Sequence, residues 1–358
     1  MRWLVLFVVA LAAGCVTDPF SQLETTTPQL TTAQLNDLQK RAQPPAALGI
    51  QVQQQGVMLS FAGINEYKVP PMVTQSLEKA SSSDLTAPGG QYRVPVVKAT
   101  INGQANVRVL LDSGSNRNLL GYSLARKLGV PAIAGLKPMN SFGIGGMVDN
   151  YPALIALMQV GGMELRRIFA LISPDTQVLN FRAGLFGDTQ LMVFGVSQLR
   201  SLSYLTLDYL RGTVTFGARE SYQRDRSLNF GTAVPLRWES DLPYVDVMID
   251  EKWKRPSLID TGGDYGLVLP RAQASGMHYW QPSRGQVSAS HGVGGSTLDT
   301  RYVIKRVTMG GANFMDVPAR TIASGPEMSD RQLMLGNVLL RRYRDTFDFR
   351  HNQLWLER

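Results

Sequence analysis

Cysteine and histidine are both scarce in this chain, which has one cysteine and three histidines among its 358 residues. A single cysteine allows no disulfide within the chain, so the stability of the fold has to come from its packed core. His278, His291 and His351 lie far apart in sequence, and none of them has the spacing of a zinc site. We therefore expect no metal and no other cofactor.

Long runs of basic residues are missing as well. The formal net charge is +8, but lysine and arginine are scattered along the chain. This pattern does not favour a nucleic-acid partner. A hydrophobic content of 44% with 18% charged residues is typical of a globular protein, and 358 residues suffice for two lobes that each have a core.

One short apolar run marks the N-terminus. Met1 and Arg2 precede the apolar residues 3–13, and Gly14 and Cys15 follow them. A charged start, a short apolar segment and small residues are typical of a secretory signal, and the run is too short to span a bilayer permanently.

This N-terminus resembles the signal of a bacterial lipoprotein. The resemblance implies that residues 1–14 are a signal peptide and that Cys15 becomes the lipid-modified N-terminus, which leaves carboxylates and hydroxyls to carry any chemistry. It implies a protein anchored to a lipid membrane in the cell envelope and facing the periplasm. Val16 and Thr17 lack the aspartate associated with inner-membrane retention, so we expect the outer membrane. Ordinary secretion with a leftover cysteine is the alternative.

Residues 15–89 are expected to form an anchor, a spacer and an N-terminal extension. Residues 17–47 are rich in threonine, glutamine and proline, with one short helix predicted over 33–41 behind a Thr31 or Thr32 cap. Residues 50–69 have some strand character. Whether this stretch joins the fold or covers a cleft like a propeptide stays open.

Beyond residue 90 the sequence contains the same series of segments twice. Residues 110–115, Leu-Leu-Asp-Ser-Gly-Ser, recur as residues 258–263, Leu-Ile-Asp-Thr-Gly-Gly, at an offset of 148 positions (260 minus 112). Residues 141–146 recur at 290–295, at an offset of 149. Because the segments follow in the same order, we expect two copies of one unit, over residues 90–219 and 220–358. The apolar period in each copy is mostly that of strands.

Each copy carries one Asp-Ser/Thr-Gly turn after an apolar strand. Such a triplet alone is usually a plain turn, but its recurrence at equivalent places allows two carboxylates, Asp112 and Asp260, to meet between paired units. Two carboxylates in contact share one proton, which provides an acid and a base together. Gly114 and Gly262 permit a sharp turn, and the hydroxyls of Ser113 and Thr261 are expected to bond across the junction.

The two turns, together with Met-Leu-Gly-Asn at residues 334–337, resemble the retropepsins and their bacterial relatives over residues 90–358. The resemblance implies a mainly β fold, with two retropepsin-like β-barrel lobes related by a pseudo-twofold axis and an active-site cleft between them. It implies an aspartic endopeptidase whose catalytic dyad is Asp112 and Asp260. The residues implied to support the dyad loops are Ser113, Gly114, Ser115, Thr261 and Gly262.

The resemblance also implies that the glycine-rich segment of each copy is a flap that closes over an extended substrate and donates backbone hydrogen bonds to it. A lone glycine-rich turn is usually just a hairpin tip, but here its place after the aspartate is repeated. The flap residues are Gly143, Ile144, Gly145 and Gly146 in the first copy and Gly292, Val293, Gly294 and Gly295 in the second.

One position departs from this pattern, because Gly263 stands where Ser115 stands in the first copy. A side chain that supports the second aspartate is therefore expected to be missing. This favours an alternative, a catalytically impaired envelope lipoprotein that binds peptides, and a third possibility is a scaffold that uses only its anchor. We expect a protein or peptide substrate, and a monomer because the dimer is fused in one chain.

Overall fold

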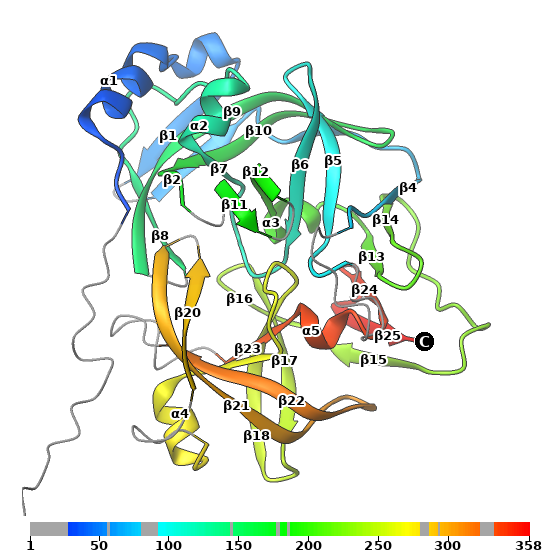
Figure 1. The fold of residues 1–358 in the computed structure, drawn as a ribbon. Helices are drawn as coiled ribbons and strands as arrows, with labels where there is room; N and C mark the ends of the chain where they lie inside the picture. The colour runs from blue at the N-terminus through cyan, green and yellow to red at the C-terminus, as the bar shows by residue number, and fades with distance from the viewer. Residues whose placement is uncertain are drawn as a thin grey trace, which may run out of the picture.

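The computed structural model describes residues 28–358 except 56–57, 80–91, 144–145, 177–179, 185–186, 280–285, 293 and 323–332. The signal peptide predicted for residues 1–14 and the lipid anchor predicted at Cys15 lie outside the described residues. Within the ranges that are described, helices are too short or too polar to cross a membrane. Strands dominate in both copies and form barrel-like sheets, which confirms the mainly β prediction (Figure 1).

The first copy forms the upper lobe in Figure 1. Its elements are β5 (Val96–Ile101), β6 (Gln104–Asp112), β7 (Leu119–Gly121), α2 (Tyr122–Lys127), β8 (Met139–Gly143), β9 (Gly146–Val160), β10 (Met163–Ser173), β11 (Asn180–Gly184), β12 (Gly187–Gly195), α3 (Val196–Leu199), β13 (Tyr204–Asp208) and β14 (Thr213–Gly217). The main sheet also takes in β3 (Glu66–Lys68) from the N-terminal extension. Its order is β3-β10-β7-β12-β6-β5-β9-β8, and β9 also pairs with β10, which curls the sheet upon itself.

The second copy forms the lower lobe and ends the chain. Its elements are β15 (Gly231–Pro235), β16 (Arg237–Glu239), β17 (Leu242–Ile249), β18 (Trp253–Asp260), β19 (Leu267–Leu269), α4 (Arg271–Gly276), β20 (Gln286–Gly292), β21 (Gly295–Met309), β22 (Ala312–Ile322), β23 (Leu333–Gly336), α5 (Asn337–Leu340), β24 (Arg344–Asp348) and β25 (Gln353–Glu357). The main sheet has the order β16-β17-β18-β23-β19-β22-β21-β20, and β17 also pairs with β21.

The strand pairings correspond copy by copy. β6 lies parallel to β12 in the first copy, and β18 lies parallel to β23 in the second. These pairs set Gly195 beside Asp112 and Gly336 beside Asp260. The same pairings therefore bring each aspartate to the same place in its own sheet, while the pseudo-twofold axis itself stays a prediction.

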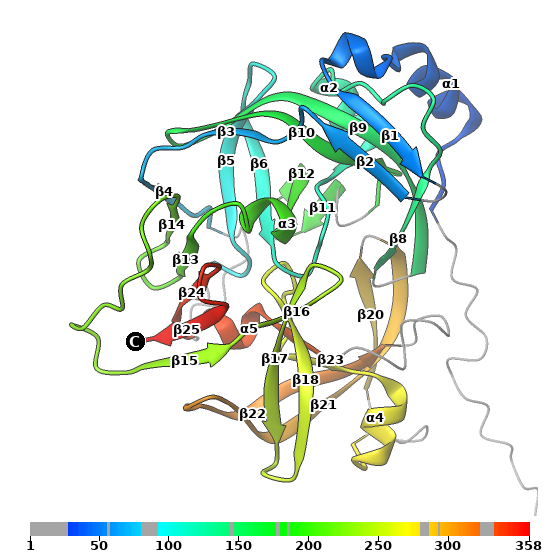
Figure 2. The same cartoon turned by 180° about the vertical axis from the view of Figure 1, so that it is seen from behind.

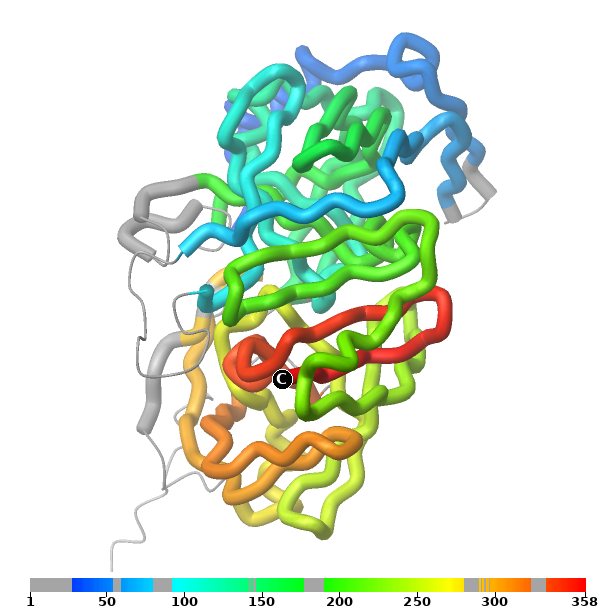
Figure 3. Tube along the Cα trace, turned by 90° about the vertical axis from the view of Figure 1, so that its right-hand side faces the viewer, coloured from blue at the N-terminus to red at the C-terminus, as the bar shows by residue number. Residues whose placement is uncertain are grey.

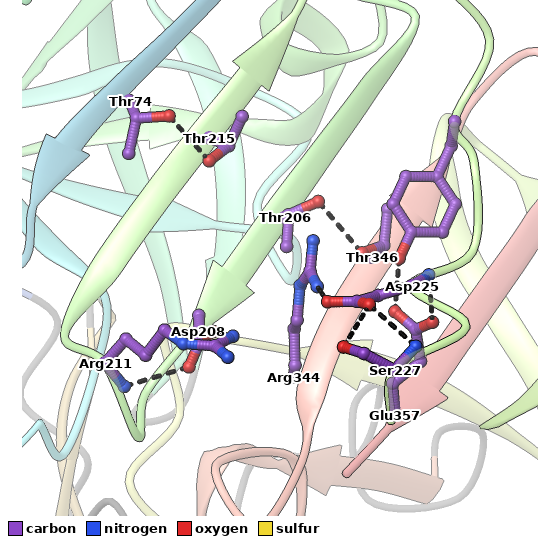
Figure 4. A network of polar contacts seen from close by, with 11 residues as sticks. Thr74, Thr206, Asp208, Arg211, Thr215, Asp225, Ser227, Arg344, Thr346 and Glu357 are labelled. Carbon is purple, nitrogen blue, oxygen red and sulfur yellow. Dashed lines mark hydrogen bonds and ion pairs between the residues drawn. The ribbon is translucent and has the colours of Figure 1, made fainter. Parts of the chain in front are cut away.

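A third sheet joins the two lobes and is built from the last hairpin of each copy. Its order is β15-β25-β24-β13-β14-β4, where β4 (Met72–Ser76) comes from the N-terminal extension. β13 of the first copy is antiparallel to β24 of the second. Figures 2 and 3 show it beside the junction of the lobes. Across it the hydroxyls of Thr206 and Thr346 lie 2.9 Å apart, and those of Thr74 and Thr215 lie 3.0 Å apart (Figure 4). The lobes are thus held by backbone hydrogen bonds as well as by side chains.

The N-terminal extension is part of these sheets. Its elements are α1 (Thr32–Arg41), the 3-10 helix η1 (Pro45–Leu48), β1 (Gln51–Gln55), β2 (Met58–Ala62), β3 (Glu66–Lys68) and β4 (Met72–Ser76). The helix predicted over residues 33–41 is confirmed, and Thr31 caps it by accepting from the backbone N–H of Gln34 (3.3 Å). Because β3 pairs with β10 and β4 pairs with β14, this stretch extends the fold at its outer strands.

The apolar core runs through both copies and reaches the ends of the two aspartate-bearing strands. Leu111, directly before Asp112, is 1% exposed, and Ile259, directly before Asp260, is fully buried. Burying a side chain of this size contributes about 1.5–3 kcal/mol. The turns that follow β6 and β18 are therefore anchored on well-packed strand ends.

Candidate active site

Asp112 and Asp260 are the last residues of β6 and β18, and each is followed by a tight turn that passes close to a neighbouring loop. A Cβ atom on Gly195 would lie 2.4 Å from the carbonyl oxygen of Arg117, and one on Gly336 would lie 2.4 Å from that of Tyr265. Only glycine fits at these two positions, since real Cβ atoms do not approach other atoms so closely. The two turns are thus supported in the same way in both copies.

Ser113 and Thr261 bind the two turns to each other. The backbone N–H of Ser113 donates to Thr261 Oγ1, and the backbone N–H of Thr261 donates to Ser113 Oγ, both at 3.0 Å. Each hydroxyl then donates across the junction, Ser113 to the Ile259 carbonyl (2.6 Å) and Thr261 to the Leu111 carbonyl (2.7 Å). Ser113 is 2% exposed and Thr261 is 1% exposed. The hydroxyls predicted to meet across the junction are thus brought together, in a reciprocal and buried set of bonds.

The carboxyl groups of Asp112 and Asp260 lie near each other across this junction, close enough that each shifts the pKa of the other. A Cβ atom on Gly114 would lie 2.6 Å from Asp260 Cγ, and one on Gly262 would lie 2.6 Å from Asp112 Cγ. Each glycine therefore makes the room that the carboxyl of the opposite turn occupies. The backbone N–H of Gly114 donates to Asp112 Oδ1 at 2.8 Å.

Burial dominates the electrostatics of the pair. It raises the pKa of Asp112 well above the ordinary value, and the charge of Asp260 raises it further. Burial also raises the pKa of Asp260, but hydrogen bonds from Tyr265 and Asp112 oppose that rise. Two carboxylates held this close cannot both ionise at low cost, so the arrangement favours one shared proton.

Tyr265 is a site residue that the sequence did not single out. Its hydroxyl donates to Asp260 Oδ2, from a ring that is 6% exposed. The expectation that Gly263 leaves the second aspartate without a supporting side chain is therefore wrong. In the first copy the hydroxyl of Ser115 donates to the carbonyl of Arg117 (2.8 Å). The sequence did hold a signal for this contact, because Gly263 leaves free space beside Asp260 and Tyr265 follows two positions later.

A charged cluster holds the loop that contains Tyr265. Asp264 forms ion pairs with Arg93, from the segment that enters the first copy, and with Arg341 (3.4 Å), which follows α5. The side-chain amide of Asn337 donates to the carbonyl of Arg93 at 2.6 Å. The start of the first copy and the second aspartate loop are therefore fixed to each other.

The glycine-rich segments form two hairpin tips that touch. Gly143 pairs with Gly146 between β8 and β9, and Gly292 pairs with Gly295 between β20 and β21. A Cβ atom on Gly294 would lie 2.1 Å from the carbonyl oxygen of Gly146, so the two tips are in backbone contact. Figure 1 shows the hairpins meeting from opposite lobes. The predicted flap residues Ile144, Gly145 and Val293 lie outside the described residues.

Comparison with known proteins finds a similarity over the part of the chain that contains the first aspartate turn. Residues 97–196 match the family model of an aspartyl protease, a range that contains Asp112 and the first glycine-rich hairpin. No curated protein matches the chain. Among solved structures, a retropepsin-like aspartic protease from Rickettsia conorii is 15% identical, with 36% of this chain and 89% of that chain covered and a TM-score of 0.27. Over residues 97–196, which carry the first aspartate turn and lie in a β-rich fold, the chain is thus similar to an aspartyl protease.

Proposed function

We propose that the protein is an aspartic endopeptidase in which Asp112 and Asp260 together activate a water molecule. The observation that carries this proposal is the closeness of two half-buried carboxyls, each of which shifts the pKa of the other, on turns joined by reciprocal hydrogen bonds. A single proton shared by such a pair supplies both a base and an acid at one point.

The reaction follows from that shared proton. The ionised carboxyl takes a proton from water, and the oxygen of that water forms a bond to the carbon of the peptide group. At the same time the protonated carboxyl donates to the carbonyl oxygen, which gives a neutral tetrahedral intermediate. The carboxyl that received the proton then passes it to the leaving nitrogen as the C–N bond breaks, while the other carboxylate takes a proton from a hydroxyl of the intermediate, so that the acyl part leaves as a carboxylic acid. The pair of carboxyls again holds one proton.

The hairpin tips supply a means of holding the substrate. Their backbone contact at Gly146 and Gly294 fits two flaps that close together over an extended peptide. Such flaps donate backbone hydrogen bonds to the substrate and keep bulk water away from the reacting group. This favours unfolded or extended segments of a protein as substrates.

Peptide cleavage by the purified full-length chain tests the proposal. We expect the parent protein to hydrolyse members of a broad peptide library, with a bell-shaped dependence of kcat/KM on pH because one carboxyl must be ionised and the other protonated. The Asp260→Ala variant is expected to hydrolyse none of them. If the parent cleaves no peptide between acid and neutral pH, or if the variant cleaves as well as the parent, the proposal is wrong.

A substitution at one hairpin tip tests the role of the flaps. In Gly294→Ala the new methyl group collides with the Gly146 carbonyl, so the tips are forced apart, and we expect kcat/KM to fall about tenfold, mostly through KM. Gly276→Ala is the matched control, because a Cβ there meets no atom within 4 Å. Equal kinetics in both variants would contradict a role of the tips in holding substrate.

The alternative of a catalytically impaired peptide-binding lipoprotein rested on the missing side chain at position 263. The hydroxyl of Tyr265 supplies a donor to Asp260 and takes away that support. We therefore place hydrolysis ahead of simple binding.

We also propose that Cys15 carries the lipid anchor of a monomeric protein that faces the periplasm from the outer membrane. The N-terminal sequence and the presence of two aspartate turns in one chain support this proposal. Separation of membrane and soluble fractions is its test, and recovery of the Cys15→Ser variant in the membrane fraction would oppose it.

A further inference from the structure

The two aspartate loops differ in the atoms that support their carboxyls. The carboxyl of Asp112 accepts the backbone N–H of Gly114 at 2.8 Å. The carboxyl of Asp260 accepts the hydroxyl of Tyr265. A side-chain hydroxyl therefore supports the second carboxyl, whereas a backbone N–H supports the first.

The absence of a side chain at Gly263 is what admits the tyrosine ring. A Cβ atom at this position would lie 2.3 Å from Tyr265 Cε1 and 2.7 Å from Asp260 Oδ2. A serine like Ser115 therefore does not fit here together with the ring. At the same offset of 148 positions, the residue of the first copy that corresponds to Tyr265 is Arg117 (265 minus 117).

Arg320 packs on the face of the Tyr265 ring. The guanidinium carbon of Arg320 lies 4.7 Å from the centre of the Tyr265 ring, and its Nη1 donates to Ser290 Oγ at 2.7 Å. It also pairs with the buried carboxylate of Asp299 at 3.5 Å. Ser290 is in β20 and Asp299 is in β21, so the β20–β21 hairpin fixes Arg320, and Arg320 in turn packs on the Tyr265 ring.

Tyr265 remains a donor throughout the working range of the enzyme. Burial raises the pKa of its hydroxyl well above the ordinary value, and the neighbouring charge of Asp260 raises it further. A neutral phenol that donates to a carboxylate stabilises the charged form of that carboxylate.

We propose that Tyr265 is a positioning residue that determines which carboxyl of the dyad is ionised. It holds the negative charge on Asp260 and leaves the proton on Asp112. This inference rests on the proposed hydrolytic function. Asp260 is then the base that takes the proton from water, and Asp112 is the acid that donates to the carbonyl oxygen of the substrate. The two copies are thereby chemically unequal, although their aspartates end equivalent strands.

The pH dependence of Tyr265→Phe tests this assignment. Without the hydroxyl the ionised form of Asp260 loses a donor, so its pKa rises and the acidic limb of the kcat/KM profile is expected to move to higher pH. Below that limb we expect kcat/KM to fall roughly 10- to 100-fold relative to the parent. The matched control is Tyr122→Phe, which removes a hydroxyl that donates at 2.7 Å to the carboxylate of Asp37, in α1 of the N-terminal extension. Its profile is expected to coincide with that of the parent.

Carbon-13 NMR of the aspartate carboxyls provides a readout that does not need turnover. The resonances of Asp112 and Asp260 are assigned with the two single Asp→Asn variants, and their titrations are compared in parent and Tyr265→Phe protein. We expect Asp260 to ionise at lower pH than Asp112 in the parent, and this order to weaken or reverse in the variant. An unchanged titration and an unchanged profile would overturn the role of Tyr265, while cleavage by the parent would leave the proposed function standing. Absence of cleavage by the parent would remove the hydrolytic function, and the titration would still decide which carboxyl the tyrosine favours.

Discussion

Asp112→Asn is expected to lower kcat/KM for peptide hydrolysis on the order of a thousandfold and, at neutral pH, to raise the free energy of unfolding. The activity falls because an amide cannot exchange the proton that the pair shares. The stability rises because the amide removes a carboxyl whose ionisation is opposed by burial and by the charge of Asp260. The asparagine oxygen can still accept the N–H of Gly114, so the turn keeps its bond.

The gain in stability is expected to depend on pH. The pKa of Asp112 in the folded state lies above the ordinary value of 3.8, so the folded protein binds this proton more tightly than the unfolded chain does. The stability that the proton provides is present below that value and is lost as pH rises through the raised pKa. The advantage of Asp112→Asn should therefore be small at pH 3 and grow towards pH 7, as urea unfolding at the two pH values can measure.

A surface aspartate gives a control of opposite sign. At Asp246 burial pushes the pKa upward, but Arg237 and Lys254 outweigh it and lower the pKa. The Nζ atom of Lys254 lies 3.1 Å from the Asp246 carboxylate. The stability from this carboxylate is present above its ordinary pKa, so Asp246→Asn should be neutral or destabilising at pH 7. A loss of stability in Asp112→Asn at pH 7, or turnover equal to that of the parent, would contradict the shared proton.

Thr261→Val is expected to destabilise the protein by about 3 kcal/mol. Valine has nearly the same shape, but it removes the acceptor of the Ser113 N–H and the donor to the Leu111 carbonyl. These groups lie at a buried junction, and each one left unsatisfied costs roughly 1–3 kcal/mol. Equilibrium unfolding in urea measures the loss, and we expect activity to fall with it because the two turns lose part of their alignment.

Thr215→Val is the matched control for this change. Its hydroxyl pairs with that of Thr74 at 3.0 Å, in an exposed part of the shared sheet, where water can replace the bond. We expect a cost within about 0.5 kcal/mol. If both threonine variants lost the same free energy of unfolding, the buried bonds between the two turns would contribute no more to stability than an exposed one.

The two aspartate turns could be predicted from the sequence because their pattern is local and is repeated. An apolar strand followed by Asp-Ser-Gly or Asp-Thr-Gly specifies a turn at the end of a buried strand, and the offset between Asp112 and Asp260 indicates equivalent places. The mainly β class follows from the same short-range periodicity. Strand character for part of the extension was also visible at residues 50–69.

Tyr265 and the shared sheet could not be predicted in this way. The bond between Tyr265 and Asp260 depends on a gap at Gly263, on the path of the loop and on a guanidinium group from β22. The sheet that joins the lobes pairs β13 with β24, and β14 with β4 of the extension. Such contacts are decided by tertiary packing between segments far apart in sequence, and the local hydrophobic periodicity does not predict them.

The sheet shared by the lobes restricts how a long polymer can reach the catalytic pair. Since β13 of one copy is bonded along its length to β24 of the other, the lobes cannot swing apart like jaws without breaking that ladder. The pairing of β13 with β24 stays intact if the substrate threads in beneath the hairpin tips or if the tips lift. In the proposed peptidase, access to the aspartate pair is thus expected at the hairpin tips, which lie across the lobes from the shared sheet in Figure 1.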